Sequence, residues 1–224
     1  MGRIDLHIHT NISDGVLSPK EIIDEAVKNG VDTISITDHD SLEAYTDDFY
    51  DYATKNNIII INGVEISTKI DKGTIHVLGY NLDINNEQFK RKLRELRNSR
   101  HEYLRKVAEK LKGLGYLVNV DELEKVEAIT KAHIAKNVVE NAKNSELLLK
   151  EFGFIPSKGD FIEKIMNYGC PAFVRKETLT PKEAAILIRS IGGKVVLAHP
   201  IAYVYERNMS VEEIIDIAKE METD

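Results

Sequence analysis

Two histidines near the start of the chain, His7 and His9, lie two residues apart in the segment 4–10. Apolar residues at alternate positions predict a short β-strand there, and side chains two residues apart on a strand point to the same face. The two imidazoles therefore project together, as a chelating pair for a borderline metal ion would. A His-x-His pair alone is weak evidence, because it is often just two surface histidines.

More side chains of metal-ligand type follow along the chain, at or just past apolar runs. With the first pair they include five of the seven histidines: the further candidates are Asp14, His39, Glu65, His76 and His199. The alternative of surface or capping histidines needs a separate coincidence at each position. It is strongest for His76, which lies inside a predicted strand and could be a buried core residue. Asp38 and Asp40 are expected to support ligands or cap a turn rather than bind metal.

The chemistry of these side chains narrows the possible metals and reactions. Imidazoles and carboxylates without thiolates suit Mn²⁺, Fe²⁺ or Zn²⁺ better than Ca²⁺. Two or three such ions can lower the pKa of a bound water toward ~7, neutralise phosphoryl oxygens and hold the geometry of an in-line displacement. The pattern therefore predicts a metal centre, and hydrolysis of a phosphate ester is one reaction that such a centre could catalyse.

The composition bounds the class of protein. With 224 residues, 42% hydrophobic and 30% charged, the chain is long enough for one large domain or a core with an insertion. The formal charge of −7 argues against a general nucleic-acid coat, and we expect no stable nucleic-acid complex. A single cysteine, Cys170, excludes an internal disulfide framework and fits a reducing compartment. With no signal peptide and no apolar run long enough for a membrane, we expect a cytoplasmic protein with no membrane partner; its oligomeric state is open.

The elements that must position the candidate ligands alternate between strands and helices at first. Expected strands cover 4–10, 31–37, 58–61, 64–66 and 74–80, with helices opening at Pro19 and covering 42–55. From 86 to 168 only helical patterns occur, and alternation resumes with strands at 171–174 and 194–198. We therefore predict a core of 1–85 and 169–224 with a helical insertion of 86–168. Polar ligands at the carboxyl ends of parallel strands favour a barrel-like α/β architecture, although the expected strands fall short of the eight of a full barrel.

The candidate ligands and their neighbours form a set of motifs that resembles the polymerase and histidinol phosphatase (PHP) family over essentially the whole chain. The motifs are His7-x-His9, Asp14, Thr37-Asp38-His39-Asp40, Gly63-Val64-Glu65, His76 and Ala198-His199-Pro200. The resemblance implies a distorted seven-stranded (β/α)7 barrel with up to three divalent metals. No Asp-x-His motif, which completes the family's metal cluster, follows His199. We therefore expect an incomplete barrel that lacks the last strands, by truncation or, alternatively, in a degenerate member.

The resemblance also implies roles for the ligands. His7, His9 and Glu65 would hold the first metal, Glu65, His76 and His199 the second, and Asp14 with His39 the third. We hypothesise that a hydroxide bridging the metals beside Glu65 attacks phosphorus, while Asp14 and His39 position the third metal and the phosphate. These three residues are the catalytic candidates.

Candidate contacts to the substrate lie in the insertion and just after it. Arg97 and Arg100 are one helical turn apart where the family places an arginine pair that grips a phosphate, although a charge run on a helix is more often a solvated face. His133 stands in a Lys-Ala-His segment where relatives have Arg-Pro-His. Arg175 and Lys176 follow the expected strand 171–174 and are further candidate phosphate contacts.

The interpretation that follows is a metal-dependent phosphoesterase acting on a small nucleotide. The best candidates for its substrate are a nucleoside 3′,5′-bisphosphate and the 5′ end of a short oligoribonucleotide. A histidinol-phosphate-type monoesterase is the alternative among enzymes. A truncated or degenerate metal-binding module without turnover is the alternative from another class.

Overall fold

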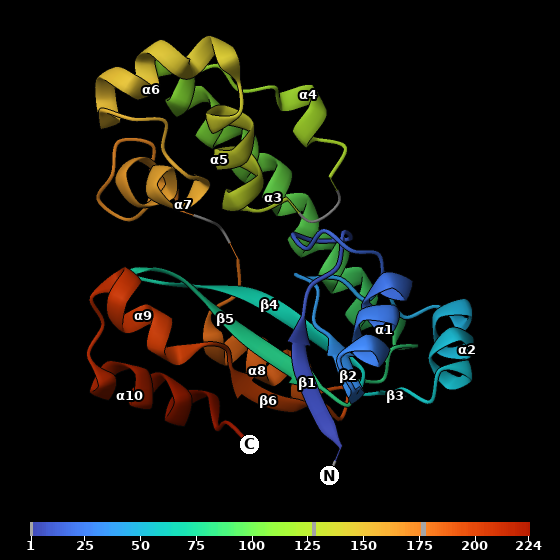
Figure 1. Ribbon diagram of the computed structural model, residues 1–224. Coiled ribbons are helices and arrows are strands. Elements are labelled where there is room, and N and C mark those ends of the chain that lie inside the picture. The colour runs from blue at the N-terminus through green and yellow to red at the C-terminus, as the bar shows by residue number, and fades with distance from the viewer. Residues whose placement is uncertain (1, 127–128, 176–177) are drawn as a thin grey trace.

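The computed structural model describes residues 2–126, 129–175 and 178–224 (Figure 1). Its strands are β1 (Arg3–Ile8), β2 (Val31–Ile36), β3 (Ile59–Ile60), β4 (Gly63–Ile70), β5 (Gly73–Tyr80) and β6 (Lys194–Leu197). Its α-helices are α1 (Pro19–Lys28), α2 (Asp47–Lys55), α3 (Glu87–Gly113), α4 (Val120–Leu123), α5 (Lys131–Val139), α6 (Ser145–Phe152), α7 (Lys158–Phe161), α8 (Pro181–Arg189), α9 (Pro200–Arg207) and α10 (Val211–Met221). A 3₁₀-helix, η1 (Ala142–Asn144), and a π-helix, η2 (Ile162–Met166), complete the list.

The first sheet is parallel, as the alternation of strands and helices predicts. Its order is β1-β2-β3, and α1 and α2 pack on it through a core that includes Ile23, Ile34 and Phe49. Ser18 caps α1 in a capping box with proline at the start of the helix. The helix expected over 42–55 begins only at Asp47, because the Thr46 side chain accepts a hydrogen bond from the Phe49 amide and so fixes the helix start there.

The second sheet differs from the expected series of parallel strands. Its order is β4-β5-β6, and both β4–β5 and β5–β6 are antiparallel pairs. The connection between β4 and β5 consists of Asp71 and Lys72 alone and leads into Gly73, whose φ of +131° an L side chain rarely adopts. So short a loop can join only antiparallel neighbours, since a parallel crossover needs a dozen or more residues.

The two sheets meet at the end of β2. His39 forms an isolated parallel bridge with Glu65 of β4, and the amide of Asp40 donates to the carbonyl of Glu65 over 2.9 Å. Within the described ranges the strands form two three-stranded sheets and no closed barrel. The molecule is thus a mixed α/β fold in which side chains from both sheets are brought to one junction.

The long helix α3 links the sheets to the helical segments above them in Figure 1. Its first half buries Phe89 and Leu93 in the core of the second sheet. Its second half buries Leu104 and Leu111 in a separate core with helices α4 to α7. One helix therefore belongs to two hydrophobic cores and holds the helical layer over the sheets.

The strand expected at 171–174 is absent. There the amide of Ala172 donates to the carbonyl of Ile165 over 2.8 Å, and the amide of Phe173 donates to Cys170 over 3.0 Å. This segment is a turn that packs back on η2, because its amides bond to the preceding helix rather than to a neighbouring strand. Alternation resumes only with α8 and β6.

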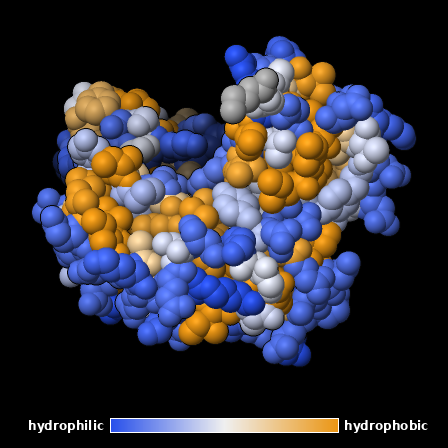
Figure 2. Space-filling model, turned by 90° about the horizontal axis from the view of Figure 1, so that it is seen from below, coloured by the Kyte–Doolittle hydropathy of each residue, from blue (hydrophilic) through white to orange (hydrophobic). Residues whose placement is uncertain are grey.

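The surface carries hydrophobic patches between hydrophilic ones, as the face seen from below shows (Figure 2). Exposed apolar side chains include Ile4 of β1 and Ile59 of β3, the two outer strands of the first sheet. Among the helices that the structure describes, none combines the length and the apolar character that crossing a membrane requires.

Candidate metal centre

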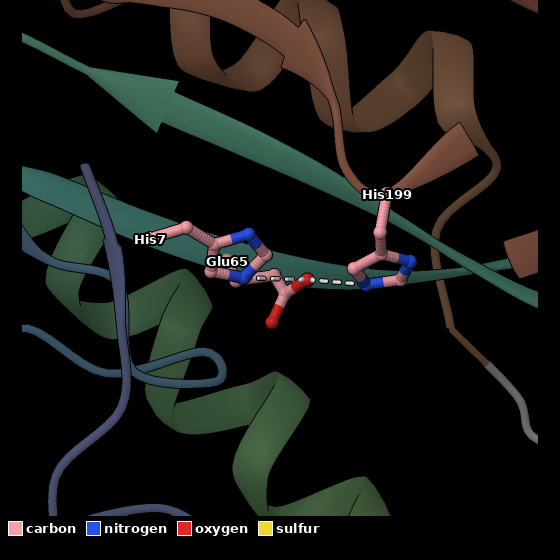
Figure 3. A group of neighbouring side chains, drawn as sticks. All are labelled: His7, Glu65 and His199. Atoms are coloured by element: carbon pink, nitrogen blue, oxygen red, sulfur yellow. Dashed lines mark hydrogen bonds and ion pairs between the residues drawn. The ribbon is translucent and has the colours of Figure 1, made fainter. Parts of the chain in front are cut away.

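The candidate ligands come from separate elements and meet at the junction of the two sheets. His7 lies on β1 with His9 just past its end, Glu65 and His76 lie on β4 and β5, and His199 follows β6. Figure 3 shows the imidazoles of His7 and His199 on opposite sides of the Glu65 carboxylate. Glu65 and His76 lie within strands, as the sequence predicts, but these strands form an antiparallel pair rather than parallel neighbours.

Glu65 is the centre of the cluster, and only 1% of its surface is exposed to solvent. Its Oε1 lies 3.4 Å from Nε2 of His7, 3.1 Å from Nδ1 of His76 and 3.2 Å from Nε2 of His199. Its Oε2 lies 3.1 Å from Nε2 of His9 and 3.2 Å from Nδ1 of His39. One carboxylate therefore faces all five histidines that the sequence singled out.

Asp14 extends the cluster on the side of His9 and His39. Its two carboxylate oxygens lie 3.4 Å from Nδ1 of His9 and 3.6 Å from Nε2 of His39. The loop that carries Asp14 is tightly folded, because a Cβ on Gly15 would lie 2.2 Å from the carbonyl oxygen of His9. Glycine at this position lets the loop approach the backbone closely enough to bring Asp14 to the site.

The donor set fits divalent metal ions. Nε2 of His7 lies 3.2 Å from Nε2 of His9, and Nδ1 of His76 lies 3.3 Å from Nε2 of His199. Two nitrogens bound tetrahedrally at 2.0–2.1 Å to one Zn²⁺ would be separated by about 3.3 Å. Nδ1 of His39 is buried beside Glu65 without the geometry of a hydrogen bond to it, as expected of a lone pair directed at a shared ion.

Among the residues that the structure describes, two sets of three have ligand atoms all within 4.8 Å of one another: His7, Glu65 and His199, and His9, His39 and Glu65. The family resemblance divides the same residues differently, with His7 and His9 on one ion. Both divisions use Glu65 as a bridge between ions. Which ligand holds which ion stays a prediction.

Electrostatics hold three of the candidate ligands, Glu65, Asp14 and His76, in the protonation states that bind a metal ion. Burial would raise the pKa of the Glu65 carboxyl, but the facing imidazoles of His76 and His39 hold that pKa well below its usual range. Burial would likewise raise the pKa of Asp14, and its contact with His39 lowers it below its usual range. Burial lowers the pKa of His76 to about 4, which leaves its imidazole neutral near pH 7. The pKa of His9 is raised, because Glu65 outweighs the opposing effect of burial.

Neighbouring residues fix the ligands in place. The hydroxyl of Tyr203 accepts a hydrogen bond of 2.8 Å from the amide of His76, and its ring meets the His199 ring edge-on. His199 has a φ of +28°, an unusual conformation for a residue other than glycine. Asp38 accepts hydrogen bonds from Thr10 and Ser13 in the loop that leads to Asp14. Asp38 thus supports the ligand loop, as the sequence suggested.

Arg97 and Arg100, the predicted phosphate contacts, are buried against the sheet junction. The Arg100 guanidinium donates to the Asp40 carboxylate, the Ile129 carbonyl and the Ser67 hydroxyl over 2.7, 2.9 and 3.0 Å. Arg97 donates to the Asp40 carbonyl over 2.8 Å and pairs with Glu43. Both guanidinium groups therefore have protein partners already, and a contact with substrate stays a prediction.

The remaining predicted contacts have different surroundings. His133 accepts a hydrogen bond from the amide of Thr130 as part of the cap of α5, and it is close enough to Asp14 to influence the Asp14 pKa. Arg175 is exposed and pairs with Asp71 over 2.9 Å. Lys176 lies outside the described residues.

A cleft of about 760 Å³ runs from the cluster between the second sheet and the helices above it. Asp14, His39 and His76 lie on its wall, so the candidate metal centre opens directly into it. The cleft has the size of a small-molecule site. Its wall also includes Lys131 and Arg207, which sequence reasoning did not select as site residues. Arg207 carries no motif, and only the fold of α9 brings it to the cleft.

Comparisons with known proteins agree with this arrangement. The PHP domain family matches residues 5–183. The 5′-3′ exoribonuclease Rnm of Escherichia coli is 34% identical over 203 residues, which are 89% of this chain and 66% of the relative. The 3′,5′-nucleoside bisphosphate phosphatase of Chromobacterium violaceum is 27% identical over 220 residues, 96% of this chain and 73% of the relative. The chain thus spans about two thirds to three quarters of the length of these relatives.

Solved structures show the same fold. An amidohydrolase from Chromobacterium violaceum with bound sulfate and no metal matches with a TM-score of 0.80 and 25% identity, over 99% of this chain and 74% of the other. A putative metal-dependent phosphoesterase from Bifidobacterium adolescentis matches with a TM-score of 0.78 at 20% identity, over 100% of this chain and 76% of the other. With the family match covering residues 5–183, the chain belongs to the PHP domain family.

Proposed function

We propose that the chain is a metal-dependent phosphoesterase that hydrolyses a phosphate ester of a small nucleotide. The observation that carries the proposal is the convergence of five imidazoles on the single buried carboxylate of Glu65, beside a cleft of about 760 Å³. Such a set of donors suits two or more divalent ions of the Mn²⁺, Fe²⁺ or Zn²⁺ type. Family membership and the names of the relatives support the same class of reaction.

The ligand residues would divide the work of hydrolysis among them. Divalent ions held by the cluster would supply an activated water and neutralise charge on the phosphoryl group. Glu65 would keep two ions close together, because its two oxygens face different histidines. Asp14 and His39 line the cleft and would orient the phosphate at the reacting end. A neutral His76 and ionised Glu65 and Asp14 favour metal binding near neutral pH.

A nucleotide is the substrate class that the surroundings favour. The cleft is larger than a single phosphate needs and could hold a base and sugar as well. The relatives with the names given above act on nucleoside bisphosphates or RNA, and the amidohydrolase structure holds a sulfate, an analogue of phosphate. We therefore propose a nucleoside 3′,5′-bisphosphate or the 5′ end of a short oligoribonucleotide.

We also propose that the two sheets are part of the distorted barrel that the family resemblance implies. The parallel bridge between His39 and Glu65 supports this, because it joins the first sheet to the second at the metal centre. The core of 1–85 and 169–224 and the insertion of 86–168 remain our proposal for the domain organisation. The separate hydrophobic core around the second half of α3 supports that division.

The experiment that tests the function combines metal loading with turnover. The chain is stripped of metal with a chelator, reloaded with Mn²⁺, Fe²⁺ or Zn²⁺, and assayed for phosphate release from adenosine 3′,5′-bisphosphate, a 5′-phosphorylated oligoribonucleotide and histidinol phosphate. We expect metal-dependent turnover of a nucleotide substrate and a loss of at least 100-fold in Glu65→Gln. His101→Ala, a histidine change on α3 outside the cluster, is the matched control and should keep full activity.

Each other outcome contradicts the proposal in a different way. Turnover of histidinol phosphate alone would replace the nucleotide substrate with an amino-alcohol phosphate. Stoichiometric metal binding without turnover of any of the three would indicate a metal-binding module.

A further inference from the structure

Two cations, Lys131 and Arg207, lie on the wall of the cleft. Within the described part of the chain, neither Lys131 nor Arg207 forms an ion pair, and Nε of Arg207 is buried with no hydrogen-bond partner. Nζ of Lys131 donates to an uncharged group, Oδ1 of Asn167, over 3.2 Å. A buried donor left without a partner costs about 1–3 kcal/mol. The unused donors therefore indicate a ligand with acceptor atoms.

The two cations are close enough to repel each other. Burial lowers the pKa of Lys131 to about 8, and the positive charge of Arg207 is the next largest cause of that shift. Glu206, next to Arg207 on α9, is near enough to offset part of this repulsion, but within the described residues it forms no ion pair with either cation. Asp160, another acidic residue of the cleft wall, accepts hydrogen bonds from Ser157 at the cap of α7. Two like charges held together in a partly buried cleft are unfavourable unless an anion binds between them.

The position of this pair distinguishes it from the metal centre. Nη1 of Arg207 lies 2.9 Å from the position that a Cβ on Gly73 would occupy, so the guanidinium rests on the glycine at the start of β5. The candidate ligand His76 lies three residues further along the same strand, about 10 Å away. An anion at Lys131 and Arg207 would therefore be a second one, in addition to a phosphate at the metal centre.

We propose that Lys131 and Arg207 form a second anion subsite, which binds a phosphate of the substrate other than the one that is hydrolysed. That the bound anion is a phosphate of the substrate rests on the proposed function, whereas the anion site itself rests on the geometry of the cleft. The subsite would select substrates that carry two phosphates over those with one. Arginine suits the role because its planar donors match phosphate oxygens, and lysine adds a point charge.

The test compares substrates with one and two phosphates. The first measurement shows which phosphate of adenosine 3′,5′-bisphosphate is released. The ratio of kcat/KM for this bisphosphate to that for the adenosine monophosphate that carries only the released phosphate (3′ or 5′) is then measured in the wild-type chain and in Arg207→Gln and Lys131→Gln. We expect the ratio to fall at least tenfold in each variant. Lys136→Gln, an exposed change on the same helix as Lys131, should leave the ratio unchanged. An unchanged ratio in both site variants, or equal losses for both substrates, would overturn the subsite.

A 5′-phosphorylated dinucleotide distinguishes the two sources of a second phosphate. If kcat/KM falls in the site variants for the bisphosphate alone, the subsite binds a terminal phosphate. If kcat/KM falls for the dinucleotide too, the subsite binds a phosphodiester as well. Either result supports the subsite.

A binding measurement separates failure of the subsite from failure of the proposed function. Inorganic phosphate is titrated calorimetrically into the metal-free chain, and we expect affinity to drop at least tenfold in Arg207→Gln. Arg207→Lys retains the positive charge and should recover part of the phosphate affinity that Arg207→Gln loses. If no substrate is turned over but phosphate binding shows this dependence, the proposed function fails and the anion site stands. If phosphate binding is the same in all variants, the anion site is wrong whatever the activity.

Discussion

Oε1 of Glu65 lies 3.2 Å from Nε2 of His199, although 134 residues separate the two in the sequence. The contact joins the middle of β4 to the residue that follows β6. Because β5 lies between these strands, the second sheet must be fully formed before the two side chains can meet. The candidate metal centre is therefore a product of the tertiary fold rather than of one local motif.

The Arg100–Asp40 pair lies at the same junction, with side chains that are 2% and 1% exposed. Replacing Arg100 by alanine would break this buried ion pair, and removing one partner of a buried pair costs about 3–5 kcal/mol. We expect Arg100→Ala to lower the free energy of unfolding by that amount, measured by urea denaturation. Arg105→Ala removes an exposed pair with Glu124 and should cost little. A stable Arg100→Ala with a raised KM would contradict this role and favour a contact with substrate.

Tyr203 is expected to act as a positioning residue for His76. Tyr203→Phe removes the hydroxyl that accepts from the His76 amide over 2.8 Å, and a buried amide without a partner costs about 1–3 kcal/mol. We predict lower stability by that amount and weaker Zn²⁺ binding in a competitive chelator titration. Tyr205→Phe changes an exposed tyrosine and should alter neither. Unchanged Zn²⁺ affinity in Tyr203→Phe would argue that the hydroxyl does not orient the ligand.

Gly15 is required by the close approach of the ligand loop to His9. A methyl group there would lie 2.2 Å from the His9 carbonyl oxygen, so Gly15→Ala must shift the loop that carries Asp14. We expect metal affinity to fall by roughly 10–100-fold, as for other changes that misplace ligands. Gly113→Ala, at the end of α3 with open space around it, is the control and should be neutral or stabilising. Wild-type affinity in Gly15→Ala would show that Asp14 is not a ligand.

Lys131 should make both substrate binding and stability depend on pH. Burial and the nearby Arg207 lower the Lys131 pKa to about 8, from 10.5 in an unfolded chain. The unfolded chain therefore binds more protons between these values, so the Lys131 contribution to the free energy of unfolding rises as pH increases from about 8 to 10.5. In the folded chain the lysine loses its charge as pH rises through about 8, and KM for a bisphosphate should increase there.

Lys131→Arg checks this assignment, because arginine stays charged across the range. Its KM should remain flat where that of the wild-type chain rises. A rise of the same size in both would assign the pH dependence to another group.

The candidate ligands could be selected from the sequence, whereas their geometry could not. His7, His9, His39 and His199 follow or end apolar runs, and the fold brings them together. The antiparallel hairpin was missed, since alternation of apolar residues reveals a strand but not its direction. The hairpin is what brings Glu65 and His76, which lie on neighbouring strands, to the same site.

The surroundings of the cationic residues were the hardest part to predict. Arg97 and Arg100 lie in a run of lysines and arginines on α3 that is typical of a solvated face, yet both are buried by contacts with a loop 54 to 60 residues earlier in the chain. Arg207 lies far from every motif in the sequence. Only tertiary packing places it over Gly73, so no local pattern could have selected it.

Anomalous diffraction from crystals grown with Zn²⁺, recorded on both sides of the zinc absorption edge, tests the proposed metal centre most directly. We predict zinc peaks at about 2.0–2.2 Å from an oxygen of Glu65 and from nitrogens of at least two of the clustered histidines. The opposite result is a map with no zinc peak within bonding distance of Glu65.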